Sequence, residues 1–416
     1  MRVIVLGAGL LGVTSAYYLQ QLGHEVTVID RHAMPAANAR GRNPARAASA
    51  AVAAAQEFER AAARQQPSAS VLRPIRRSVQ CFLASLFQRG AALQDPGAEL
   101  EKLCAYSRVA ARSLHETTTV PPAARGESLL RIYTDRHAFD AVTARTPRLQ
   151  ALGCERRVLT ATEAAGIEPA LASSIGHIAG AMLSLDGPSG DASAFAAEMV
   201  FLCRAAGVRF LTEHTVVALH EGEGRVDHVE VINGHGERRC MRAQAYVLAL
   251  GSASLKHVNE LGQELPLSFA RQYAIDVPVR PGATAPTIAL YDNDSNMRLR
   301  PTLRDGKPAG LRLTCSVPVQ PCRRHDGDPA RFDTMLRRAE LLLPGVVDTP
   351  RAQFQTRLQT ITSNGLPLIG RTRLPNLFLN TAPGSLGWVN ACGAGKSIAR
   401  IVSGLRPELA FAFTGL

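Results

Sequence analysis

Three glycines and one aspartate near the N-terminus have the types and the spacing needed to bind a phosphorylated ligand. Gly7, Gly9 and Gly12 follow an apolar run, and Asp30 closes the next one. In this pattern the first glycine permits a tight turn, the second lets the backbone approach a pyrophosphate, and the third lets a helix pack closely. A carboxylate at the position of Asp30 can bond a ribose hydroxyl. The chemistry that these residues predict is dinucleotide binding.

The segments around these residues have the order that such a site requires. Residues 2–6 are apolar enough for a buried strand, 10–22 have apolar positions at helical spacing, and 25–29 predict a second strand. Together they form a βαβ unit, in which the N-terminus of the helix offers free amides and a partial positive charge to phosphate.

Two further glycine-containing segments favour FAD over a nicotinamide cofactor. Gly251 follows the apolar strand predicted over 245–250, and the Gly384–Trp388 turn opens a final helix predicted over 387–403. A nicotinamide dehydrogenase usually completes its nucleotide domain contiguously, whereas these segments lie far from Gly7. Amides of the 384–388 turn are suited to face a flavin ring, on which negative charge develops during reduction.

Composition excludes several other classes of protein. Hydrophobic residues make up 46% of the 416 residues and charged residues 20%, which predicts a folded chain of more than one lobe. The formal charge is +12, but the arginines are scattered and aromatic residues reach only 5%, so we expect no nucleic-acid partner. No apolar run approaches the roughly 20 residues that span a bilayer. The eight cysteines show no zinc spacing, so we expect no metal and a reduced, cytoplasmic protein. A peripheral contact with the inner face of the cytoplasmic membrane stays open.

Four collinear stretches resemble one flavoprotein family. They are 2–31, 168–210, 245–254 and 365–404, the last with Gly384-x-Leu-Gly-Trp388 and Ala391-Cys392-Gly393. On these residues the chain resembles the small subunit of D-amino-acid dehydrogenase, within the wider D-amino-acid oxidase group. The N-terminal motif is shared with many flavoproteins, and the C-terminal one is more discriminating.

The resemblance implies an α/β fold with two domains. A discontinuous Rossmann-type FAD-binding domain would use 1–90, 150–254 and 350–416. A substrate domain built on an antiparallel sheet would use 91–149 and 255–349. Residues 128–134, 208–250 and 270–319 predict strands, and 135–153, 192–206 and 331–343 predict helices.

The resemblance also implies a cofactor, a reaction and a set of contacts. The cofactor is FAD, and the reaction oxidises the amine carbon of a D-amino acid to an imino acid, which hydrolyses to a 2-oxo acid and ammonia. Electrons would pass to a respiratory-chain acceptor. The implied FAD contacts are Leu6, Gly7, Ala8, Gly9, Leu10, Leu11, Gly12, Asp30, Arg31, Val216, Gly251, Gly384, Ser385, Leu386 and Gly387.

The substrate side of the chain departs from the family. Tyr273 and Arg271, aligned with a Lys-Gly-Tyr element, are the candidate catalytic residues, whereas Gln359 stands where the family has an arginine. Glutamine cannot form a charge-assisted clamp on a carboxylate, and 36–66 has an unusual Ala/Arg composition. Two alternatives therefore stay open. One is oxidation of glycine, sarcosine or proline-type amines, and the other is a non-catalytic flavin-binding partner protein.

Overall fold

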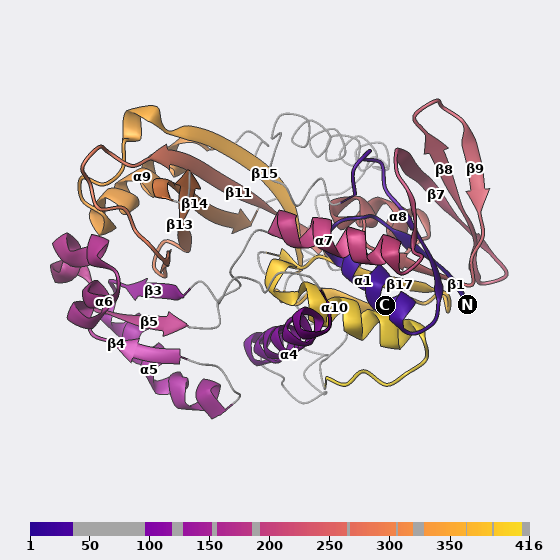
Figure 1. Ribbon diagram of the computed structural model, residues 1–416, viewed down its shortest axis with the longest axis horizontal. Coiled ribbons are helices and arrows are strands. Elements are labelled where there is room, and N and C mark those ends of the chain that lie inside the picture. The colour runs from indigo at the N-terminus through magenta and orange to yellow at the C-terminus, as the bar shows by residue number, and fades with distance from the viewer. Residues whose placement is uncertain are drawn as a thin grey trace, which may run out of the picture.

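Two β-sheets lie on opposite sides of the molecule and organise the fold. The computed structural model describes residues 1–35, 96–118, 128–151, 156–184, 192–263, 267–304, 307–318, 328–362, 364–384 and 387–409. Figure 1 shows one lobe that holds both chain ends and a second lobe beside it. No helix in these ranges is long and apolar enough to cross a membrane.

The first sheet is a mostly parallel, six-stranded sheet of the Rossmann type. Its strands in spatial order are β16 (Leu368–Arg371), β17 (Leu377–Thr381), β10 (Ala245–Leu248), β1 (Arg2–Leu6), β2 (Glu25–Ile29) and β6 (Arg209–Leu211). Only the edge strand β16 runs antiparallel to its neighbour. Because central parallel strands are buried on both faces, β1 after Arg2 and the whole of β10 are continuously apolar.

Alternate residues of β1 point into two different cores. Val3 and Val5 pack with the helices α1 (Leu10–Gln21), α4 (Pro96–Thr117), α7 (Ala192–Ala205) and α10 (Gly387–Val402). Ile4 and Leu6 pack with the meander β7 (His214–Gly222), β8 (Arg225–Asn233) and β9 (Arg238–Met241), and with α8 (Ser254–Glu260). The sheet is therefore the middle of three layers, and its strand ends stay open at one edge.

Two glycines let α10 lie directly against its neighbouring helices. A Cβ on Gly395 would stand 2.8 Å from the backbone of Thr14 in α1, and one on Gly393 would stand 2.9 Å from the Cα of Ser107 in α4. The Gly393 amide also donates to the Ser107 hydroxyl at 3.0 Å. This close packing fixes α10, and with it the turn that precedes it, over the first sheet.

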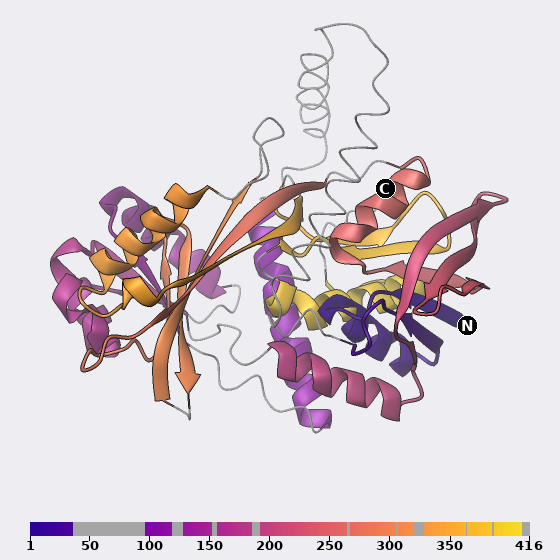
Figure 2. The same cartoon turned by 90° about the horizontal axis from the view of Figure 1, so that it is seen from above.

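The second sheet has eight strands and is almost wholly antiparallel. In spatial order they are β15 (Gln353–Thr362), β11 (Leu267–Pro278), β14 (Lys307–Pro318), β13 (Met297–Arg304), β12 (Ala289–Asp292), β3 (Leu129–Tyr133), β5 (Gly180–Ser184) and β4 (Arg156–Leu159). Only β12 and β3 pair in parallel. Figures 1 and 2 show β11 and β15 extending from this lobe toward the first.

Helices cover both faces of the second sheet. The helix α9 (Pro329–Leu342), with α6 (Ala161–Ile167) and the 3₁₀ helix η3 (Pro169–His177), packs on one face, and α5 (Arg136–Ala151) packs on the other. Buried Glu168 ties η3 to the chain before β12, because its carboxylate accepts from the amides of Thr287 and Ile288 at 2.7 and 3.1 Å.

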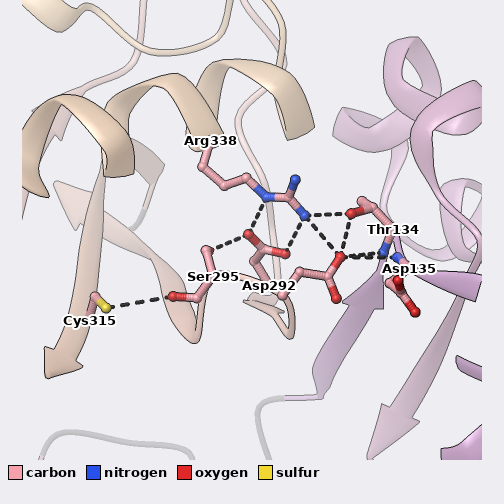
Figure 3. Close-up of polar contacts among 7 residues, drawn as sticks. Thr134, Asp135, Asp292, Ser295, Cys315 and Arg338 are labelled. Atoms are coloured by element: carbon pink, nitrogen blue, oxygen red, sulfur yellow. Dashed lines mark hydrogen bonds and ion pairs between the residues drawn. The ribbon is translucent and has the colours of Figure 1, made fainter. Parts of the chain in front are cut away.

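An ion network fastens α9 to the sheet beneath it. The guanidinium of Arg338 donates to the fully buried carboxylate of Asp292, to Asp294 and to the hydroxyl of Thr134. Figure 3 shows Arg338 of α9, Asp292 at the end of β12 and Thr134 just after β3 converging. The hydrogen bond to Asp292 is the main reason that the pKa of Arg338 is raised. Burial by itself would raise the pKa of Asp294, but hydrogen bonds with Thr134 and the Asp135 amide, together with the charge of Arg338, lower it.

The predicted fold class is confirmed: the protein is α/β, with a Rossmann-type sheet and a second, antiparallel sheet. The strands predicted over 2–6 and 25–29 match the structure, as do the helices over 10–22 and 331–343. The sequence patterns missed β4, β5, β15 and α8. The 36–66 segment lies outside the described residues.

The two sheets contain other residues than the predicted boundaries of the two domains would assign to them. Strands β4, β5 and β15 belong to the eight-stranded sheet, although their residues were assigned to the FAD-binding domain. Conversely, α4 packs against α1 and α10 of the first lobe through Leu103, Ala110 and Leu114. These helical residues face an apolar groove between two helices, which the sequence pattern alone does not identify.

Candidate functional site

A cavity of about 470 Å³ opens where the strands of the first sheet end. The carboxyl ends of β1, β2 and β10 meet there, which is the usual ligand site of an open parallel sheet. The second sheet contributes part of the wall. The lining residues are Gly7, Gly9, Leu10, Leu11, Ile29, Asp30, Arg31, His32, His214, Thr215, Val216, Ala249, Leu250, Gly251, Ala253, His257, Gln272, Gln359, Pro383, Gly384, Gly387 and Trp388.

The glycine turn after β1 is too tight for side chains at two of its three positions. Gly7 adopts φ +105°, and a Cβ there would stand 2.5 Å from the carbonyl oxygen of Ala249. A Cβ on Gly12 would stand 1.8 Å from the carbonyl oxygen of Gly7. A Cβ on Gly9, by contrast, would meet nothing within 4 Å, because this glycine faces the cavity. A diphosphate therefore has room to approach the backbone at Gly9.

The N-terminus of α1 presents uncapped amides to the same space. Gly9 is the N-cap residue, no side chain caps the helix, and its first turn holds no acidic residue. Leu10 and Leu11, the first residues of the helix, line the cavity. Such a helix end binds anions through its free N–H groups and its dipole.

Asp30 is held rigidly at the end of β2. Its Oδ2 accepts from the Ala8 amide at 2.7 Å, and its Oδ1 accepts from the His32 amide at 2.8 Å. The His32 Nδ1 also contacts Oδ1, at 2.7 Å, so Oδ1 already has two partners. A carboxylate has about four acceptor positions, so Oδ2 can still accept from a ligand hydroxyl. The carboxylate thus fixes the glycine turn and keeps acceptor capacity on the cavity wall.

Three later segments complete the part of the wall that belongs to the first lobe. Val216 lies at the start of β7, and Gly251, at φ +60°, opens the 3₁₀ turn η4 (Gly251–Ala253) after β10. Gly384, at φ +57°, comes just before α10, in whose first turn Trp388 packs edge-on against Phe195. The buried indole Nε1 of Trp388 has no hydrogen-bond partner among the described residues.

The residues predicted to bind the cofactor fall into three groups. Ten of them line the cavity, namely Gly7, Gly9, Leu10, Leu11, Asp30, Arg31, Val216, Gly251, Gly384 and Gly387. Leu6, Ala8 and Gly12 lie behind the wall. Leu6 belongs to the buried strand β1, the Ala8 amide donates to Asp30, and Gly12 packs against the Gly7 carbonyl. Ser385 and Leu386 lie outside the described residues.

The two predicted catalytic residues are not brought to the cavity. The Tyr273 ring packs against Phe332 of α9, and its hydroxyl oxygen accepts from the Asp328 amide at 3.2 Å. Successive residues of a strand face opposite sides, so the neighbouring Gln272 lines the cavity instead. Arg271 shares the parity of Tyr273 and is not among the lining residues.

Gln359 and His257 add polar groups that face the cavity. Gln359 Nε2 donates to the Ser316 hydroxyl at 3.0 Å. His257 on α8 is 3% exposed, and burial lowers its pKa to about 4, so the imidazole is neutral near pH 7. Its Nδ1 lies 3.4 Å from a Glu260 oxygen but makes no hydrogen bond. The sequence patterns did not single out His257, because a lone histidine on a short helix carries no recognisable spacing.

These features fit a flavin dinucleotide. The uncapped helix end suits a diphosphate, and Asp30 suits a ribose. The cavity volume falls within the range of about 300–1,000 Å³ that is typical of ligand sites.

Comparison with known proteins agrees with this geometry. Residues 2–401 match a family described as FAD dependent oxidoreductase. A D-amino acid dehydrogenase of Methylobacterium sp. (strain 4-46) is 33% identical over 99% of this chain and 97% of its own length. Another, from Agrobacterium fabrum, is 30% identical over 98% and 97%.

Solved structures share the fold at lower identity. L-proline dehydrogenase from P. horikoshii superposes with a TM-score of 0.72 at 14% identity, covering 98% of this chain and 95% of that one. Glycine oxidase from Bacillus cereus gives 0.66 at 16% identity, covering 97% and 95%. At such identities the likeness shows a common fold.

Proposed function

The chain belongs to the FAD dependent oxidoreductase family, and from that premise we propose that it oxidises the amine-bearing carbon of an amino acid, D-amino acids first. The product is an imino acid, which water converts to a 2-oxo acid and ammonia. The names of the curated relatives support this choice of substrate. The observation that carries the proposal is one cavity that joins the glycine turn to two strands of the second sheet.

The cofactor-binding residues follow from the geometry of the cavity. The amides of Leu10 and Leu11 would hold the diphosphate of FAD, and Asp30 would bond the adjoining ribose. Val216 would lie toward the adenine, and the segments at Gly251 and Gly384 would lie toward the flavin ring. Bound there, FAD supplies the hydride acceptor.

The protein's own part in the reaction is to bind, orient and exclude water. A neutral amine provides its own electronic push, so the site needs no strong protein base. It must hold the Cα–H bond in place, which positioning groups can do. Gln272 and Gln359 are the polar side chains that the second sheet offers for this purpose, and Trp388 and Pro383 help to close the wall.

The two sheets suggest which part of the protein binds the cofactor and which part binds the substrate. We propose that the first sheet, with α1, α4, α7 and α10, forms the FAD-binding domain, and that the eight-stranded sheet forms the substrate domain. The cavity would then lie between them, as ligand sites often do.

We further propose that the electrons leave to a respiratory-chain acceptor. The relatives are named dehydrogenases, which supports an acceptor other than oxygen. The net charge of +12 would favour a peripheral contact with anionic lipid at the inner face of the cytoplasmic membrane.

An anaerobic spectrum tests the proposed function. FAD-loaded protein is mixed with both enantiomers of a panel of amino acids and of their amides, and with glycine, sarcosine and proline. We expect the flavin absorbance near 450 nm to bleach with D-enantiomers. Bleaching by sarcosine or proline alone would move the substrate to those amines, and no bleaching by any compound would refute the proposal.

A further inference from the structure

A histidine two residues after Asp30 belongs to the wall at the nucleotide end of the cavity. His32 lines the cavity, and its Nδ1 lies 2.7 Å from Oδ1 of Asp30. The amide of the same residue donates to the same oxygen at 2.8 Å. One oxygen of the carboxylate therefore contacts both a backbone group and a side-chain group of His32.

The contact fixes where the imidazole carries a proton. A carboxylate oxygen only accepts hydrogen bonds, so a separation of 2.7 Å requires a hydrogen on Nδ1 of His32. The neutral ring in its Nδ1–H form and the doubly protonated ring both meet this requirement. The bond to Asp30 is therefore compatible with either charge state of His32.

Backbone hydrogen bonds on both sides of Asp30 hold the pair in place. The Asp30 amide donates to the Leu211 carbonyl, and the Asp30 carbonyl accepts from the His214 amide, each at 3.0 Å. The His32 carbonyl accepts from the Glu213 amide at 3.3 Å. The chain after β2 is thus fixed against the end of β6 and the start of β7, so the fold itself keeps the two side chains in contact.

The protein fills most of the acceptor positions of the Asp30 carboxylate. Each oxygen has about two such positions. The two groups of His32 fill those of Oδ1, and the Ala8 amide fills one of those of Oδ2, at 2.7 Å. About one position then remains, on Oδ2. A ribose, however, carries two neighbouring hydroxyls, on its 2′ and 3′ carbons.

We propose that His32 is a positioning residue that limits Asp30 to a single ribose hydroxyl of the cofactor. This inference rests on the proposed binding of FAD. The imidazole holds Oδ1, and Oδ2 accepts from one hydroxyl, so the carboxylate distinguishes the 2′ hydroxyl from the 3′ hydroxyl. Without the imidazole, Oδ1 regains an acceptor position and the carboxylate can accept from both.

Three nucleotides test the inference without turnover. ADP carries both hydroxyls of the ribose, whereas 2′-deoxy-ADP and 3′-deoxy-ADP each lack one. Calorimetric titration of the full-length apoprotein gives the Kd of each compound. We expect one deoxy compound to bind about tenfold weaker than ADP, the usual effect of losing a hydrogen bond to a charged group. The other should bind nearly as well as ADP. Equal losses for both compounds, or no loss for either, would overturn the inference.

Substitutions at His32 distinguish a positioning role from a merely structural one. His32→Ala removes the imidazole, so the ratio of the Kd values of the two deoxy compounds should fall toward one. His32→Asn places an amide nitrogen where Nδ1 stands, and it should keep the wild-type ratio. A structural role would weaken all three nucleotides equally and leave the ratio unchanged in His32→Ala, which would refute the inference. If a variant does not fold, the wild-type titrations decide on their own.

His214→Ala is the matched control for these variants. His214 also lines the cavity, but its Nδ1 contacts the Thr212 carbonyl, at 2.6 Å, and not Asp30. The ratio of the two Kd values should therefore stay at the wild-type value, whatever the change does to affinity. A ratio that falls in His214→Ala as far as in His32→Ala would count against a specific role of His32.

Competition with FAD separates this inference from the proposed function. If FAD displaces ADP and a single deoxy compound is weakened, both stand. If FAD displaces ADP and the two deoxy compounds are weakened alike, the role of His32 fails while the proposed cofactor site holds. If FAD does not bind, the proposed function fails, and the inference that rests on it fails as well.

Discussion

Gly12 and Gly9 belong to one motif, but a side chain added at Gly12 would clash with the protein, whereas one added at Gly9 would meet open space. A Cβ on Gly12 would collide with the Gly7 carbonyl at 1.8 Å, whereas the site of a Cβ on Gly9 is open. We expect Gly12→Ala to destabilise the protein by about 1–3 kcal/mol, the usual cost of overpacking, and to lower FAD binding as well. Thermal unfolding of the apoprotein and equilibrium dialysis with FAD measure the two effects.

Gly9→Ala is the matched change. Gly9 has φ −70°, which alanine adopts without strain, so the stability of the apoprotein should stay near that of the wild type. Its methyl group would occupy the space of the approaching diphosphate, and the affinity for FAD should fall. Unaltered FAD affinity in Gly9→Ala would contradict the placement of the diphosphate.

His257 should make the protein less stable in mild acid. Its pKa is lowered from 6.5 to about 4, because burial disfavours the charged ring and Lys256 adds repulsion. Between these two values the unfolded chain binds a proton that the folded state does not, so the free energy of unfolding falls as the pH falls. The loss is fully developed below pH 4 and amounts to on the order of 3 kcal/mol.

Urea unfolding of the apoprotein at pH 7.5 and pH 4.5 measures this effect. In His257→Leu, whose side chain would join Leu255 and Val258, the difference between the two pH values should shrink by about 2–3 kcal/mol. The exposed His235 is the control, and His235→Leu should keep the wild-type difference. An equal difference in all three proteins would show that His257 titrates normally.

The ion network between α9 and the second sheet depends on a single arginine. Removal of the Arg338 guanidinium would leave the fully buried Asp292 carboxylate without its cation. Breaking a buried pair in this way costs about 3–5 kcal/mol, so Arg338→Met should lower the free energy of unfolding by that amount. Arg337→Met is the control, because Arg337 is exposed and its guanidinium donates to the Asp333 carbonyl of the same helix. Similar losses in both variants would rule out a special role for the network.

Elements governed by local sequence were predictable, and those governed by packing were not. The β1–α1–β2 unit follows from the apolar strands and from local geometry, namely the positive φ of Gly7 and the close packing of Gly12 on the Gly7 carbonyl. Whether Tyr273 or Gln272 lines the cavity depends instead on which face of β11 packs against α9. That choice is set by a helix far along the sequence, so alignment alone placed the catalytic candidates on the face opposite the cavity.

The cavity itself is a property of the whole molecule. Its wall combines residues from the first turn of the chain, from the middle and from the last helix, and two sheets contribute to it. The glycine motif predicted the nucleotide end because all of its parts are local. Gln359 reaches the cavity only through the packing of the two lobes. His257 reaches it only through the packing of α8 on the first sheet.

A ligand that spans the cavity should therefore stabilise both lobes together. At 100 times its Kd, a ligand adds about 2.7 kcal/mol of stability, which slows exchange of the protected amides up to about 100-fold. With FAD at this level, hydrogen exchange should slow in 7–31 and also in β11 and β15, which carry Gln272 and Gln359. ADP at the same multiple of its own Kd should slow 7–31 alone, because it reaches only the end near Asp30. Exchange in β11 and β15 that is the same with ADP and FAD would mean that the flavin does not reach the second sheet.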